Sequence, residues 1–83
     1  MKITLKLFAN LREYLPLGAQ GGRVELDLPE HTTPADLIER YRLPPKLAHL
    51  VLLNGHFIEP EQRAITVMSE GDVLAIWPPI AGG

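Results

Sequence analysis

The chain ends in a segment whose residue types suit covalent chemistry at a carboxylate. The last six residues are Pro78, Pro79, Ile80, Ala81, Gly82 and Gly83. The two prolines fix φ near about −65° and lack backbone N–H groups, so neither a strand nor a helix continues through them. The final glycines carry no side chain, and an extended tail that starts at Trp77 spans roughly 20 Å. We therefore predict that the tail leaves the domain, threads a narrow channel in another protein and delivers the Gly83 carboxylate to its active site.

Three aromatic residues are candidates for a docking surface beside this tail. Phe8 ends the first alternating segment of the chain and Trp77 ends the last. If these segments are neighbouring strands, period-two alternation places both rings on the same outward face. Phe57 follows the turn dipeptide Asn54-Gly55 and can join them. An exposed aromatic cluster is typical of a protein-binding site, although the same three residues can also complete a small core.

The remaining polar residues do not indicate catalysis or metal binding. The three histidines, His31, His49 and His56, lack the spacing that would bring a pair of ligands to one helix face. The chain has no cysteine, which excludes disulfides, thiolate metal sites and a cysteine nucleophile. Asp72 follows a glycine and is predicted to cap a turn. We expect no catalytic residue, no metal and no bound cofactor.

Composition narrows the class of protein and of partner. The 83 residues are 46% hydrophobic and 22% charged, which predicts one small folded domain rather than disorder. The net charge of −2 makes nucleic acid and anionic membranes unexpected partners. The N-terminal residues alternate in hydropathy, unlike a signal peptide, and no segment reaches membrane-spanning length. We expect a cytoplasmic protein.

Hydrophobic periodicity predicts the elements that must position these residues. Residues 2–8 and 23–28 alternate as half-buried strands, with Ile3, Leu5 and Leu7 inward in the first. A short helical turn is expected at 10–15, and a helix opens with Thr33 as N-cap and Pro34 in its first turn, reaching no further than Leu43. Further strands are predicted at 50–53, 56–58 and 73–77, and residues 65–67 form either a short strand or a turn.

This order of elements favours the α+β class, a mixed sheet of four to five strands with one main helix packed across one face. The first and last strands are the most apolar, so we expect them to pair in parallel at the centre of the sheet. Leu74 and Ile76 then face the core, and Val73, Ala75 and Trp77 face outward. Residues 1–77 are predicted to form the single domain and residues 78–83 the extended tail.

Residues 71–83 also carry a resemblance to a known family. The run Gly-Asp-Val-Leu-Ala-Ile-Trp-Pro-Pro-Ile-Ala-Gly-Gly resembles the ending of the small subunit of molybdopterin synthase, the MoaD type within the MoaD/ThiS family of ubiquitin-like sulfur carriers. The Pro-Pro-x-x-Gly-Gly ending is the most specific signal, and the rest of the chain matches more loosely. The resemblance implies the β-grasp, or ubiquitin-like, topology for the sheet and helix.

The same resemblance implies a function. A ubiquitin-activating-type enzyme (MoeB/ThiF-like) would use ATP and Mg²⁺ to adenylate Gly83, and a sulfur donor system would convert the adenylate into a thiocarboxylate. The large subunit of molybdopterin synthase (MoaE-like) would then accept the tail and pass its sulfur to a pterin precursor. The chain itself would be a non-catalytic subunit. Residues matching Phe8, Phe57 and Trp77 would meet the activating enzyme.

Several alternatives stay open on the residues alone. A carrier for thiazole (thiamine) synthesis, for a tungsten cofactor or for another biosynthetic route shares the same tail chemistry. A ubiquitin-like modifier conjugated to lysines would use the same adenylate. A plain interaction module with an inert tail is the remaining interpretation. The sequence does not identify the activating enzyme, the sulfur donor or the acceptor.

Overall fold

The computed structural model describes residues 1–79, and these form a five-stranded sheet in the order β2-β1-β5-β3-β4. The strands are β1 (Lys2–Leu7), β2 (Arg23–Asp27), β3 (Leu50–Leu53), β4 (His56–Phe57) and β5 (Val73–Trp77). The first and last strands pair in parallel at the centre, and the other pairs are antiparallel. The predicted α+β architecture is confirmed, and its topology is the β-grasp that the resemblance implied.

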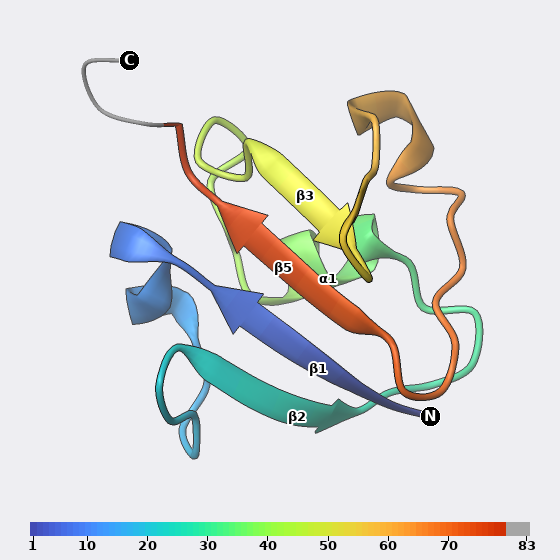
Figure 1. The fold of residues 1–83 in the computed structure, drawn as a ribbon, viewed down its shortest axis with the longest axis horizontal. Helices are drawn as coiled ribbons and strands as arrows, with labels where there is room; N and C mark the ends of the chain where they lie inside the picture. Colours follow the sequence, from blue (N-terminus) through green and yellow to red (C-terminus); the bar gives the residue numbers. More distant parts are fainter. Residues whose placement is uncertain (80–83) are drawn as a thin grey trace.

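The helix α1 (Pro34–Arg40) crosses one face of the sheet and begins where the sequence predicts (Figure 1). The Thr33 side chain accepts a hydrogen bond from the backbone N–H of Asp36 at 3.2 Å, and the Asp36 carboxylate accepts one from the backbone N–H of Thr33 at 2.9 Å. This reciprocal capping box gives the Thr33 N–H a partner and adds a second acceptor for the Asp36 N–H, which also donates to the Thr33 carbonyl at 3.1 Å. Pro34 occupies the first turn, where its missing N–H costs nothing.

The helix ends earlier than the Pro44-Pro45 pair would require. The last helical residue is Arg40, and Arg42 adopts a φ of 56°, in the left-handed region. A residue in that conformation cannot continue an α-helix, so the chain turns away before the prolines are reached. Two 3-10 helices, η1 (Ala9–Tyr14) and η2 (Pro60–Gln62), lie among the connections.

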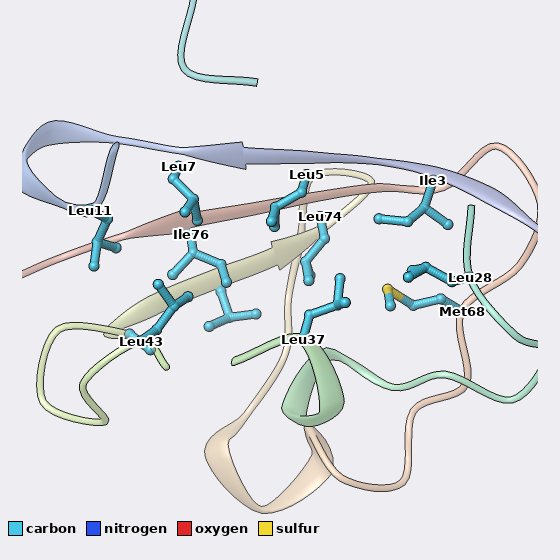
Figure 2. Close-up of a cluster of buried hydrophobic side chains, with 12 residues drawn as sticks. Ile3, Leu5, Leu7, Leu11, Leu28, Leu37, Leu43, Met68, Leu74 and Ile76 are labelled. Atoms are coloured by element: carbon cyan, nitrogen blue, oxygen red, sulfur yellow. The ribbon is translucent and has the colours of Figure 1, made fainter. Parts of the chain in front are cut away.

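The core lies between α1 and the inner face of the sheet (Figure 2). Leu5, Leu74 and Ile76 have no exposed surface, and Leu37 of α1 is 1% exposed. The other members of this buried cluster are Ile3, Leu7, Leu11, Leu28, Leu43, Ala48, Val51 and Met68. The inward faces predicted for β1 and β5 are therefore confirmed, because alternation in a strand assigns every second side chain to one layer.

The segment before β5 is irregular. No strand forms over residues 65–67: Ile65 lies in a turn, whereas Thr66 and Val67 have irregular backbone, so the turn alternative holds for Ile65 alone. Ile65 is 67% exposed and Val67 is 51% exposed. Met68 is 2% exposed, and its N–H donates to the Thr32 carbonyl at 3.0 Å. The Asp72 carboxylate accepts from the backbone N–H of Ser69 at 2.7 Å, so the predicted turn cap is present.

Within residues 1–79 there is no helix with the length and hydrophobicity needed to cross a membrane.

We expect Thr33→Ala to lower the free energy of unfolding by about 1 kcal/mol, because it removes the acceptor of the capping box. In a domain of this size that corresponds to a drop in Tm of roughly 4–8 °C, measurable by circular dichroism. Thr33→Ser is the matched control, since it keeps the hydroxyl and is expected to melt with the wild type. An unchanged Tm in Thr33→Ala would show that the capping box contributes nothing.

Candidate docking surface and tail exit

The face of the sheet opposite α1 is apolar over β5, β3 and β4 and polar over β1, where it carries Lys2, Thr4 and Lys6. The strand register places Leu50 beside Trp77, Leu52 beside Ala75, and Leu52 beside Phe57. Phe8 follows β1 at the end nearest Trp77. We call the following set the docking surface: Phe8, Leu50, Leu52, Phe57, Ala75 and Trp77. It runs from the residue after β1 across β5, β3 and β4, and it includes the end of β5 from which the chain continues into the tail.

Phe8 and Trp77 form the centre of this surface. Their ring centroids lie 3.9 Å apart and their planes differ by 6°, so the rings are stacked. The backbone of Phe8 stays extended, with φ −119° and ψ 156°, and its N–H donates to the Ile76 carbonyl at 3.2 Å. The parallel pairing of β1 and β5 thus continues one residue beyond β1. The prediction that the two residues share an outward face is confirmed, while their role in docking stays a prediction.

Phe57 lies on the same face, two strands away from Trp77. It is 46% exposed, and β3 with its outward Leu50 and Leu52 separates it from the Phe8–Trp77 stack. The structure therefore places all three predicted aromatic residues on one surface but brings only Phe8 and Trp77 into ring contact.

Leu50 and Leu52 are the members of the docking surface that the sequence did not single out. Residues 50–53 form an unbroken apolar run, which carries no alternation and hence assigns no face. Such a run is itself informative, because a strand with apolar side chains on both faces is expected to pack against another apolar surface on each face. Val51 is fully buried on the core side, whereas Leu50 is 36% exposed on the outer side.

Arg63 is a second residue that the sequence did not indicate. Its guanidinium donates from Nε to the Ile58 carbonyl at 3.0 Å, from Nη1 to the Ala48 carbonyl at 2.9 Å and from Nη2 to the His49 carbonyl at 3.1 Å. Its central carbon also lies 5.9 Å from the centroid of the Phe57 ring. Partial burial lowers the pKa of Arg63 from its ordinary value, and the nearby carboxylates of Glu59 and Glu61 oppose that change.

The tail leaves from the end of β5. The Trp77 carbonyl accepts a hydrogen bond from the His49 N–H at 3.1 Å, which is the last strand-like contact before the prolines. Pro78 is half-buried and Pro79 is exposed. The end of the last strand at Trp77 is confirmed, and the proposed tail residues Ile80, Ala81, Gly82 and Gly83 lie outside the described residues. The division into a domain of residues 1–77 and a tail of 78–83 stays a prediction.

The other polar candidates remain apart. His31, His49 and His56 are all exposed. Among residues 1–79 no three side chains of histidine, cysteine, aspartate or glutamate gather closely enough to hold a metal ion. The chemistry that the described surface supports is therefore recognition of a partner by apolar contact beside the point where the tail emerges.

A protein-family model and an individual known protein both match nearly the whole of this sequence. The ThiS family model matches residues 5–83. The molybdopterin synthase sulfur carrier subunit of Drosophila yakuba is 34% identical over 88 aligned residues, which cover 100% of this chain and 92% of that protein.

Two solved structures extend the comparison to the fold. SAMP1 from Haloferax volcanii superimposes with a TM-score of 0.69 at 26% identity, covering 100% of both chains. A chain from the complex of subunits 1 and 2 of the molybdopterin-converting factor of Helicobacter pylori matches with a TM-score of 0.60 at 19% identity, again over 100% of both chains, and at this identity shows the shared fold.

The family match spans almost the whole sequence, and the match to the relative covers all of this chain and 92% of that protein. The topology in Figure 1 agrees with that of both solved structures. The chain therefore belongs to the ThiS family and is a ubiquitin-like, β-grasp sulfur carrier of the ThiS/MoaD type.

Proposed function

We propose that this chain is the small subunit of molybdopterin synthase and that it carries sulfur as a thiocarboxylate on Gly83. The observation that carries the proposal is the 34% identity, over the full length of the chain, to a protein named as a molybdopterin synthase sulfur carrier subunit. The ending Pro-Pro-x-x-Gly-Gly, on residues 78–83, supports it independently of that comparison.

The proposed chemistry takes place on partner enzymes. A carboxylate is a poor electrophile, so an oxygen of the Gly83 carboxylate first attacks the α-phosphorus of ATP, and pyrophosphate leaves. A ubiquitin-activating-type enzyme (MoeB/ThiF-like) binds the ATP and Mg²⁺ for this step. A sulfur donor system then displaces AMP from the adenylate to leave the thiocarboxylate. In this scheme the chain is a non-catalytic subunit that binds no cofactor of its own.

The geometry of the described residues suits such a carrier. Trp77 both contributes a ring to the docking surface and ends the strand from which the tail departs. A partner that binds the docking surface therefore receives the tail from a defined point and direction. The two prolines narrow the conformations of the free tail, which reduces the entropy lost when the tail is ordered in a channel. Gly82 and Gly83 leave no side chain to obstruct that channel.

A large subunit (MoaE-like) is the proposed acceptor of the sulfur. The structural neighbour from Helicobacter pylori is a complex of subunits 1 and 2 of the molybdopterin-converting factor, which supports a two-subunit arrangement for the matching fold. Activation that depends on ATP and on a reduced sulfur donor suits the cytoplasm, and we propose that location.

A protein modifier is the second candidate function. SAMP1 of Haloferax volcanii is 26% identical over the whole chain, and its name denotes a small archaeal modifier protein. A modifier would pass the same Gly83 adenylate to a lysine amine, forming an isopeptide bond in place of a thiocarboxylate.

The direct test is the intact mass of the chain after incubation with ATP, Mg²⁺, a cognate activating enzyme and a sulfur source. We expect a gain equal to sulfur replacing oxygen, because the thiocarboxylate is the stable product of the proposed reaction. The variant that lacks Gly83 is expected to show no gain while melting within about 2 °C of the wild type, since the core lies in residues 1–79. An unchanged mass together with covalent conjugates in lysate would favour the modifier.

We expect Trp77→Glu and Phe8→Glu each to weaken binding to the activating enzyme by about 30-fold in Kd, about 2 kcal/mol, because each places a charge at the centre of an apolar contact. Isothermal titration calorimetry with the purified enzyme measures this.

Ile65→Glu is the matched control for both substitutions. It introduces the same charge at an exposed apolar side chain that is not a member of the docking surface, and binding should stay within about twofold of the wild type. Equal losses of folding stability and of binding in the Phe8 and Trp77 variants would instead identify these residues as core.

A further inference from the structure

Phe57 occupies the least supported strand of the sheet. The strand β4 has two residues and pairs with β3 alone, through Leu52 beside Phe57 and Leu53 beside His56. One further bond, from the Ile58 N–H to the Val51 carbonyl at 2.9 Å, follows these two pairs. The Phe57 ring itself is 46% exposed, so burial does little to fix the position of its side chain. Side-chain contacts can therefore add to what the strand pairing holds in place.

The Arg63 side chain makes its three hydrogen bonds to the segments that border the docking surface. One carbonyl belongs to Ile58, the residue directly after Phe57. The other two belong to Ala48 and His49, the residues directly before Leu50. The planar guanidinium presents its N–H groups in a rigid fork, so these bonds fix the two segments relative to each other.

The same network reaches the tail exit. His49 accepts from Arg63 at its carbonyl and donates from its N–H to the Trp77 carbonyl. The guanidinium also lies over the Phe57 ring, with its central carbon 5.9 Å from the ring centroid, a distance typical of a cation–π interaction. A single side chain thus connects the β4 end of the docking surface with the strand that carries Trp77.

We infer that Arg63 is a positioning residue that holds Phe57 in register with the Phe8–Trp77 stack for docking of the activating enzyme. This inference rests on the proposed function, since it assumes that the docking surface meets that enzyme. It assigns to Arg63 no contact with the reacting carboxylate.

The Arg63→Lys variant tests whether the forked geometry of the guanidinium is needed or whether a positive charge at this position is enough. Lysine keeps the positive charge but presents its donors from one nitrogen, so it cannot reproduce the fork across three carbonyls. In the free protein we expect the backbone amide NMR signals of Phe57, Ile58 and His49 to shift relative to wild type. Ile3→Val is the matched control: it removes one methyl group from the core face of β1, which β5 and β3 separate from β4, and costs about 1 kcal/mol of stability.

The functional readout is the steady-state kinetics of carrier adenylation by the activating enzyme, measured well below the Tm of every variant. We expect Arg63→Lys to raise the KM for the carrier by about tenfold and to leave kcat within about twofold, because docking is weakened and the tail is unchanged. Ile3→Val should leave both constants within about twofold of wild type, since lower stability alone does not change docking of the folded protein.

A double-mutant cycle tests whether Arg63 acts through Phe57. Phe57→Ala is expected to raise KM by itself, and Arg63→Lys should then add less than about a twofold effect in the Phe57→Ala background. Fully additive effects would overturn the inference, as would a Phe57→Ala variant with unaltered KM.

The inference and the proposed function can fail separately. Unchanged Phe57 and Ile58 signals in Arg63→Lys overturn the inference whatever enzyme the chain binds. A wild-type chain that no activating enzyme adenylates overturns the proposed function, and with it the docking role of Arg63. Shifted signals with an unaltered KM overturn the positioning role while leaving the carrier function intact.

Discussion

The parallel pairing of β1 with β5 is the contact on which the rest of this molecule depends. On the inner face it brings Leu5 beside Leu74 in the centre of the core. On the outer face the same register, carried one residue further, stacks Phe8 on Trp77. A parallel pair needs a long crossover, and the chain between β1 and β5 supplies α1 and the remaining strands. Core, docking surface and tail exit therefore follow from one pairing.

Because of this pairing, the side chains that stabilise the domain and those proposed for recognition lie on opposite faces of the sheet. The side chains that α1 covers are buried and hold the domain together (Figures 1 and 2), whereas on the opposite face the apolar side chains of the docking surface, Ala75 apart, are partly exposed. In the proposed function the chemistry takes place on partner proteins, so the domain needs only to present a surface for recognition and a fixed origin for its tail. The end of β5 suits both needs, because Trp77 belongs to the core sheet and to the docking surface at once.

On the β3–β4 side of the sheet, hydrogen bonds from a side chain to backbone carbonyls add to the apolar packing. The pairing of β4 with β3 covers only two residues of each strand, and the surrounding loops carry backbone carbonyls that need donors. The Arg63 guanidinium satisfies three of these carbonyls together. Loop geometry on this side of the domain thus depends on one polar side chain, while the β1–β5 side depends on apolar packing.

Local signals in the sequence determined much of this structure. Alternation in residues 2–7 and 73–77 assigned the core faces, since side chains in a strand repeat every second residue, and Thr33 with Asp36 marked the helix start, since a capping box spans one turn. Pro78 and Pro79 marked the end of β5. Tertiary structure alone decided the outward faces of Leu50 and Leu52, because an unbroken apolar run carries no period. It alone decided the contacts of Arg63, because the carbonyls at Ala48 and His49 lie 15 and 14 residues away in the chain and only folding brings them together.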